Sequence, residues 1–176
     1  PNARSHPLAS FARTGRAFVW TFDKKTLSPN GDGIWRDPLP LDPPAGMLSE
    51  GDRYGCAVAI DALSGIIAVS SCEGSGRVFL WTYDNKQSLW TLASPRSILS
   101  CPPPADLVGS SPADVSAATA TAAFGTSLSM HNGYMAVGAP GLAEQGGRGV
   151  AFLYAFLKVK KRSSSSTSNI INNGDN

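Results

Sequence analysis

Apolar residues alternate with polar or small ones in several short segments of the chain, which is the pattern of β-strands that bury one face. Two such segments, residues 54–60 and 124–130, both begin with an aromatic residue followed by glycine. Another short strand follows each of them, at residues 65–71 and 133–139. Glycine and proline separate the segments, and no long amphipathic helix is indicated. The pattern therefore predicts an all-β protein built from antiparallel hairpins.

The second of these hairpins can be registered residue by residue. Its turn contains Asn132-Gly133, a pair that supplies the two positive φ angles of a type I′ turn. Because side chains alternate between the faces of a strand, the turn fixes which residues share a face. The apolar face is predicted to pair Met130 with Met135 and Leu128 with Val137. The opposite face carries small residues, namely Ser127, Ser129, Ala136 and Gly138.

The first hairpin presents the same apolar face in a register that pairs Ile60 with Ile67 and Val58 with Val69. In that register Cys56 points with the apolar side chains and Cys72 points the opposite way. We therefore expect separate buried thiols and no disulfide within this hairpin. Cys101 is the third cysteine, and none of the three has the spacing of a zinc site, so cysteine usage leaves the compartment open.

Aromatic strands recur along the chain. Residues 15–23 (GRAFVWTFD) and 76–84 (GRVFLWTYD) differ only conservatively, at a constant offset of 76 − 15 = 61 positions. A third copy, residues 149–156, keeps the aromatic positions, and a fourth strand is predicted at residues 88–92 and at Ile34-Trp35. Four antiparallel strands in each unit of about 60 to 70 residues are typical of a β-propeller blade.

The repeats predict antiparallel β-propeller-type blades, about two and a half in number, within residues 1–157. The expected units span residues 11–40, 52–93 and 122–157. The first lacks its first two strands and the third lacks its fourth. Since propellers typically close with about 4 to 8 blades, we expect an incomplete propeller that is part of a larger protein. A Pro/Ser/Ala-rich insertion occupies residues 94–121, and a basic, Ser/Asn-rich tail, expected to be disordered, occupies residues 158–176.

One unit carries a recognisable motif. Phe124-Gly125 is followed by Gly138-Ala139-Pro140, then by a glycine-rich turn at residues 146–149 and an aromatic strand. This arrangement resembles an FG-GAP repeat, the repeat that forms the blades of the integrin α-subunit propeller and of many surface proteins. The second unit is similar but degenerate, with Tyr54-Gly55 in the first position and Ser70-Ser71-Cys72 in place of Gly-Ala-Pro.

The resemblance implies a propeller that binds proteins or glycans through its loops, often outside the cell. Some members of the family hold calcium in a loop between the first two strands of a blade, through alternating Asp or Asn oxygens. The corresponding loops here, at residues 61–64 and 131–132, lack that ligand set. We therefore expect neither a metal nor another cofactor.

Other candidate sites have simpler explanations. Residues 30–33 (NGDG) are expected to form a turn. His6 lies near the terminus and His131 beside a hairpin turn, and no nucleophile motif accompanies either of them, so we expect solvated histidines. The tryptophans recur regularly along the chain, which predicts that they pack in the core. They are Trp20, Trp35, Trp81 and Trp90. The cluster of basic residues at 158–162 is expected to begin the solvated tail.

Composition does not point to a particular partner. The net charge of +2, from 15 basic and 13 acidic residues, gives no field that would select nucleic acid, and no segment is long and apolar enough to span a membrane. We expect a non-catalytic module for protein or glycan binding, adhesion-like and extracellular or at the cell surface. The alternatives are a scaffold portion of a propeller-containing enzyme and an intracellular structural repeat protein.

Overall fold

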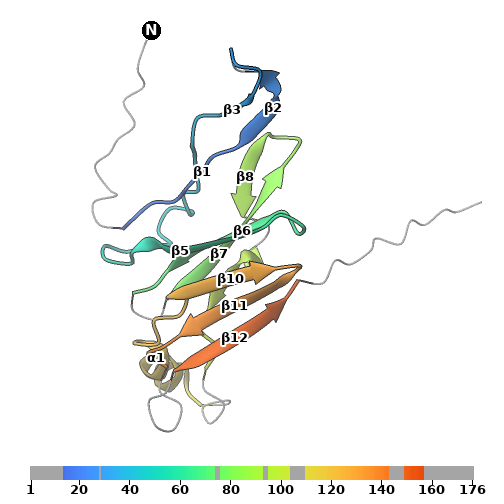
Figure 1. Ribbon diagram of the computed structural model, residues 1–176. Coiled ribbons are helices and arrows are strands. Elements are labelled where there is room, and N and C mark those ends of the chain that lie inside the picture. The colour runs from blue at the N-terminus through green and yellow to red at the C-terminus, as the bar shows by residue number, and fades with distance from the viewer. Residues whose placement is uncertain are drawn as a thin grey trace, which may run out of the picture.

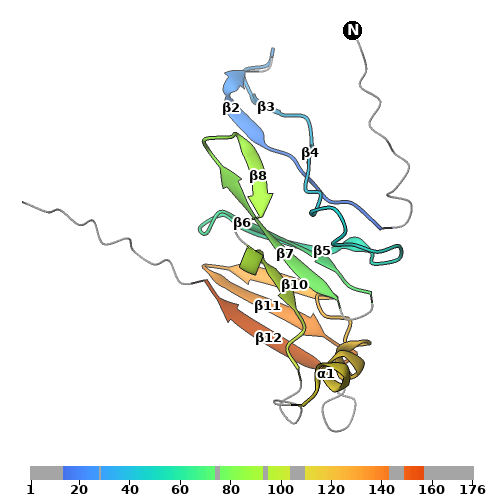
Figure 2. The ribbon, with the colours of Figure 1, turned by 180° about the vertical axis from the view of Figure 1, so that it is seen from behind.

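The computed structural model describes residues 14–27, 29–73, 76–92, 95–103, 110–142 and 149–156. These residues form antiparallel sheets with one short α-helix, so the all-β prediction is confirmed. Figure 1 shows three layers in sequence order along the molecule, and Figure 2 shows the same layers from behind. We call the layers unit one (β1 to β4), unit two (β5 to β9) and unit three (β10 to β12).

Unit two is the central sheet. Its strands are β5 (Tyr54–Asp61), β6 (Ile66–Ser71), β7 (Arg77–Asp84), β8 (Leu89–Leu92) and β9 (Ile98–Ser100). The order is β5-β6-β7-β8, and β9 pairs with the beginning of β7. Val58 lies opposite Val69 and Ile60 opposite Ile67, as predicted. The fourth strand, β8, also lies where the sequence predicted it.

Unit three is a three-stranded sheet in the order β10-β11-β12. Its strands are β10 (Ser127–His131), β11 (Tyr134–Ala139) and β12 (Val150–Ala155). The predicted register is confirmed in full, with Met130 opposite Met135 and Leu128 opposite Val137. Asn132 and Gly133 both have positive φ angles, 49° and 79°, as the type I′ turn requires.

Unit one consists of two small sheets, β1 (Phe18–Val19) with β4 (Leu39–Pro40), and β2 (Phe22–Leu27) with β3 (Gly33–Trp35). Its aromatic segment is divided between β1 and β2, whereas β7 is one continuous strand, but the ring pair at its end is the same. The rings of Phe22 and Trp35 lie 5.2 Å apart, and those of Tyr83 and Trp90 lie 5.5 Å apart at the same place in unit two.

The turns that follow these two aromatic strands are also alike. Asp23 Oδ1 accepts hydrogen bonds from the amides two and three residues further on, at 2.8 and 3.4 Å. Asp84 Oδ1 accepts the equivalent pair at the same two distances. In unit two this bond lies in the turn after β7, which ends at Asp84, whereas in unit one β2 continues to Leu27 with a shift of register after Asp23. The repeat detected in the sequence is therefore a repeat of structure.

Two hydrophobic clusters join the units. The larger lies between units two and three and includes Val78, Phe124, Met135 and Val137, all fully buried. The smaller lies between units one and two and includes Leu41, Tyr54, Phe79 and Trp81. Each face of the central sheet therefore packs on a different neighbour. This is expected, because its inner strands carry apolar side chains on both faces.

The insertion at residues 94–121 contributes regular structure that the sequence pattern did not predict. A single 3₁₀ turn (Pro95–Ser97) leads into β9, and a short helix, α1, spans Pro112–Thr119. Ser111 caps this helix, because its side chain accepts a hydrogen bond from the amide of Asp114. Since β9 pairs with β7, part of the insertion belongs to the central sheet. The predicted tail, residues 158–176, lies outside the described residues.

The prediction for Cys56 and Cys72 was wrong, because these residues form a disulfide with a Cα–Cα distance of 6.2 Å. The register of β5 and β6 shifts between Tyr54 and Val58, so the side chains at the start of β5 do not follow the alternation set by the rest of the strand. A β-bulge redirects a side chain in this way, here from the apolar face toward Cys72. Cys101 is free and buried, as expected for a thiol without a partner.

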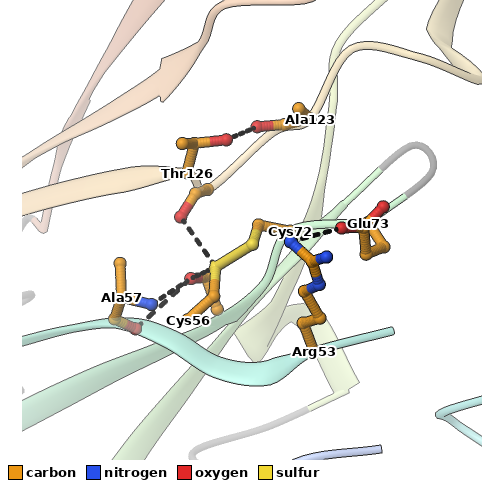
Figure 3. The surroundings of a disulfide bond; sticks show 9 residues. Arg53, Cys56, Ala57, Cys72, Glu73, Ala123 and Thr126 are labelled. Carbon is orange, nitrogen blue, oxygen red and sulfur yellow. Dashed lines mark hydrogen bonds and ion pairs between the residues drawn. A yellow bond between two sulfur atoms is a disulfide. The ribbon is translucent and has the colours of Figure 1, made fainter. Parts of the chain in front are cut away.

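Figure 3 shows the disulfide close to the segment that precedes β10. Cys56 Sγ lies 3.8 Å from the carbonyl oxygen of Gly125, and 3.3 Å from Ser70 Oγ. Arg53 and Glu73 form an ion pair of 2.9 Å beside it. The disulfide therefore ties the beginning of β5 to the end of β6 at the point where unit three meets unit two.

Candidate functional site

The aromatic-glycine motif lies at the junctions between units. Gly15 and Gly76, which begin the aromatic strands of units one and two, both have positive φ angles, 81° and 71°. A side chain on Gly15 would collide with the backbone carbonyl of Tyr54, and one on Gly76 with that of Phe124. The same backbone contact is therefore made twice, each time between one unit and the aromatic-glycine step of the next.

Tyr54 is buried at the junction of units one and two. Its hydroxyl donates a hydrogen bond of 2.7 Å to the carbonyl of Leu41 and accepts one of 3.1 Å from Trp81 Nε1. Its ring meets that of Phe79 edge to face at 5.3 Å. Burial raises the pKa of the Tyr54 phenol well above its ordinary value, so the neutral form is favoured.

Phe124 occupies the equivalent place at the junction of units two and three. It is fully buried, and its ring meets those of Phe152 and Tyr154 at 5.7 and 6.5 Å. The amide of the following glycine, Gly125, donates a hydrogen bond of 2.9 Å to the carbonyl of Gly138. These contacts are structural, and they carry no chemistry of their own.

The remaining residues of the motif have related roles. Gly55 has a φ angle of 90°, and a Cβ there would lie 2.7 Å from the carbonyl oxygen of Arg16. Ala139 is fully buried in the cluster between units two and three, whereas Pro140 is exposed. The seven residues singled out from the sequence are thus distributed over two junctions and do not form one ligand site.

A second link joins units two and three at their turns. Asp61, at the end of β5, accepts a hydrogen bond of 2.8 Å from the amide of Gly133, in the β10–β11 turn. This bond is the main reason why the pKa of the Asp61 carboxyl lies below its ordinary value. The link lies in the loop that corresponds to the calcium loop of FG-GAP propellers, by the resemblance described above.

An apolar groove lies between unit one and the hairpin β5–β6. Its volume is about 380 Å³. It is lined by residues 17–20, Leu41, residues 58–60, Ile67 and Val69. Two of these side chains are unusually exposed for their type and position in a strand, Val58 at 61% and Ile60 at 64%. We refer to this feature as the open groove.

The open groove lies where the described part of unit one has no hairpin. Within the described residues, unit one has counterparts of β7, β8 and β9, but none of β5 and β6. In units two and three the corresponding hairpins lie against each other, since β10 packs on β5. Val58 and Ile60 therefore face the position where such a hairpin of unit one would lie.

The prediction that the tryptophans pack in the core was wrong for half of them. Trp81 is 5% exposed, but Trp20, at the equivalent position of unit one, is 54% exposed, and Trp35 is 67% exposed. Trp81 is covered by unit one, whereas no described element covers Trp20. The residue pattern is the same in both units, so the difference comes from the neighbour and not from the strand.

Among the described residues, the other sequence candidates are not brought together in a site. Residues 30–33 begin in the turn between β2 and β3 and end in β3, as expected, and His131 is exposed at the end of β10. His6 and the basic residues at 158–162 lie outside the described residues. Across the part of the chain that the structure describes, no three His, Cys, Asp or Glu side chains are grouped so that they could hold a metal ion.

The sequence contained the information needed to find the open groove. It predicted both the apolar face of the first hairpin and the absence of two strands from the first unit. Combining the two observations would have predicted that Val58 and Ile60 lack a cover.

In comparisons with known proteins, no family model, no curated protein and no solved structure matches this chain. Of the described helices, none has the length and apolar character needed to cross a bilayer.

Proposed function

We propose that this chain is a non-catalytic binding module made of FG-GAP-like, propeller-type blades, and that the open groove receives a protein ligand. The observation that carries the proposal is the pair of equivalent junctions, Gly15 against Tyr54 and Gly76 against Phe124. Successive units that meet through the same contact are typical of blades stacked around an axis. The resemblance of Phe124-Gly125 and Gly138-Ala139-Pro140 to an FG-GAP repeat supports the same interpretation.

The chemistry of the groove favours a protein over a glycan. Of the side chains that line it, the indole of Trp20 alone carries a polar group. Sugars are held by several converging hydrogen-bond partners, whereas apolar side chains of a protein gain by leaving water on such a surface. Exposed aromatic residues, here Phe18 and Trp20, are common anchors in protein interfaces.

An extracellular or cell-surface location is part of the proposal. The Cys56–Cys72 disulfide supports it, because disulfides persist in oxidising compartments and are rare in the cytosol. A localisation that places the protein only in the cytosol, with intracellular partners alone, would contradict this part.

A binding screen tests the proposal. The chain would be screened against extracellular proteins and a glycan array, together with the variants Ile60→Lys and Leu153→Lys. Both substitutions place a positive charge on an exposed strand residue, since Ile60 is 64% and Leu153 is 73% exposed. We expect protein ligands whose binding is lost with Ile60→Lys and kept with Leu153→Lys. Ligands that are insensitive to Ile60→Lys, or that are all glycans, would overturn the proposal.

A further inference from the structure

We propose that Asn132 is a deamidation site whose reactivity is controlled from the neighbouring unit by Asp61. Asn132 and Gly133 form the turn between β10 and β11 in unit three, and Asp61 ends β5 in unit two. Deamidation changes the chain itself covalently, so this site does not depend on a ligand of the open groove. Three features carry the assignment: an Asn-Gly pair, a carboxylate bound to the amide that would react, and a second bond that holds the same glycine.

The reaction requires only water and the two residues of the turn. The backbone nitrogen of Gly133, after losing its proton to a base in solution, attacks Cγ of Asn132. A bond forms between these atoms, the bond from Cγ to the side-chain nitrogen breaks, and that nitrogen leaves as ammonia. Water then opens the resulting cyclic imide at either carbonyl, giving aspartate or isoaspartate, and nothing is oxidised or reduced. Glycine favours the attack, because it has no side chain to obstruct the approach of its nitrogen.

Asp61 holds the nitrogen that would attack. Its Oδ2 accepts a hydrogen bond of 2.8 Å from the Gly133 amide, and the residue is 5% exposed. The attacking form of the amide is an anion, and a carboxylate at this distance disfavours a second negative charge. The same bond lowers the pKa of the Asp61 carboxyl, so the carboxylate is present at neutral pH. Asp61 therefore suppresses the reactive form of the Gly133 amide.

The conformation of the turn is a second obstacle. Asn132 has a φ angle of 49°, in the left-handed conformation that the type I′ turn requires. From this conformation Cγ reaches the Gly133 nitrogen only after the peptide between the two residues has rotated. The rotation would break the bond to Asp61. A bond of 2.7 Å from the amide of Phe156, the residue after β12, to the carbonyl of Gly133 limits it further.

The chain contains a second Asn-Gly pair for comparison. Asn30 and Gly31 lie in the exposed turn between β2 and β3, and a Cβ on Gly31 would meet nothing within 4 Å. Within the described residues, no carboxylate accepts a hydrogen bond from the amide of Gly31. Asn30 and Asn132 are both exposed and both precede glycine, but only Asn132 has the carboxylate. Asn30 is therefore an internal reference for the reaction.

Deamidation at Asn132 would alter the junction of units two and three. Either product places a negative charge beside the Asp61 carboxylate, and like charges at this distance repel. Isoaspartate also adds a carbon atom to the backbone of the turn, which moves the Gly133 amide relative to its acceptor. We expect both products to weaken the link between the two units.

The rates of deamidation at the two asparagines test this assignment. The full chain and its variants are incubated at mildly alkaline pH, and the peptides that contain Asn30 and Asn132 are quantified by mass spectrometry. In the unaltered chain, Asn132 should react more slowly than Asn30. Asp61→Ala should raise the rate at Asn132 about tenfold, as a change of about one unit in the acidity of the attacking amide gives, and should leave Asn30 unchanged. Asp61→Asn keeps an oxygen that can accept the bond but loses the charge, so its rate should lie between the two.

Asp84→Ala is the matched control. Asp84 and Asp61 each accept a hydrogen bond from the amide two residues further on, but only Asp61 binds the β10–β11 turn within the described residues. Asp84→Ala should therefore leave the rate at Asn132 unchanged, and urea denaturation shows how far each substitution lowers stability.

Three results would overturn the assignment. One is an Asn132 that reacts as fast as Asn30 in the unaltered chain, because the carboxylate then gives no protection. Another is an unchanged rate at Asn132 in Asp61→Ala. The third is an equal rise at Asn132 in Asp84→Ala, which would show that loss of stability alone accelerates the reaction. If Asp61→Ala does not fold, Asp61→Asn decides, since its rate at Asn132 must also exceed that of the unaltered chain.

Discussion

The two junctions of the molecule differ most in the packing of their inner hairpins. Both contain a buried aromatic residue, Tyr54 or Phe124, whose backbone carbonyl lies against a glycine of the preceding unit. Only the junction of units two and three also has hairpin packed on hairpin. As a result Leu128 and Met130 are largely covered while Val58 and Ile60 are exposed.

The comparison separates two sources of stability. The aromatic-glycine contact is present even at the junction where the described part of unit one has no inner strands. Hairpin packing then adds burial on the side of the inner strands. In a stack of repeats each unit is stabilised mainly by its nearest neighbours, so unit one, whose described residues have no hairpin packing, should be the least stable of the three units.

The largest effect should come from the tryptophan that occupies the same sequence position in units one and two but is buried only in unit two. Trp81→Ala is expected to lower the free energy of unfolding by about 4 kcal/mol, because a buried aromatic side chain and its hydrogen bond to Tyr54 are lost. Trp20→Ala should cost less than about 1 kcal/mol, since exposed positions contribute little. Urea denaturation followed by circular dichroism measures both. Equal losses would show that Trp20 is covered in solution.

A pair of glycines tests the backbone contact. Gly76 and Gly65 have nearly the same φ angles, 71° and 69°, but a Cβ on Gly76 meets the carbonyl of Phe124 and one on Gly65 meets nothing within 4 Å. We expect Gly65→Ala to cost about 1 kcal/mol and Gly76→Ala about 3 kcal/mol, from the added collision. Thermal denaturation of the two variants measures the difference. A similar loss in both would mean that the junction adapts easily.

The disulfide is present in only one of the two hairpins, because Thr126 and Pro140 stand in unit three where unit two has Cys56 and Cys72. Reduction should destabilise the chain by about 2–3 kcal/mol, since a link across 16 residues restricts the unfolded state. The urea midpoint with and without reductant measures this loss. The double variant Cys56→Ser, Cys72→Ser is the control, and its midpoint should not respond to reductant.

The smallest effect concerns the hydroxyl that distinguishes Tyr54 from Phe124. Tyr54→Phe should cost about 1–2 kcal/mol at neutral pH, because Leu41 and Trp81 each lose a hydrogen-bond partner.

This contribution should depend on pH. The pKa of Tyr54 is raised in the folded protein, so its contribution is complete below the unfolded pKa of about 10 and is lost as pH rises toward the folded pKa. Stability curves of the two proteins should therefore converge above pH 10. A constant difference up to pH 12 would contradict the assignment of the buried phenol.

Local signals in the sequence predicted the hairpins well. Asn132-Gly133 determines its own turn, so the register of β10 and β11 could be read without knowledge of the rest of the fold. The alternation in residues 58–60 and 67–69 was sufficient for the register of the first hairpin. The recurrence of the aromatic strand also identified β3 and β8, because each strand pairs with a neighbour close in sequence.

Features that depend on distant or irregular contacts were missed. The bulge at the beginning of β5 has no strong signal in the sequence, and it decides whether Cys56 can reach Cys72. Helix α1 has only a weak apolar pattern, and β9 is a short strand whose partner lies some 20 residues earlier. Trp20 is exposed because no described element covers it, and no pattern within its own strand can reveal this.

The edge of β1 that faces away from β4, which no described strand pairs, bears on the behaviour of the chain in concentrated solution. An open strand edge beside exposed apolar side chains, here Phe18 and Trp20, is a template for uncontrolled aggregation. Charged residues next to such a segment oppose this, and two exposed lysines, Lys24 and Lys25, follow the aromatic run directly. We expect that neutralising both lysines would lower the concentration at which the chain aggregates.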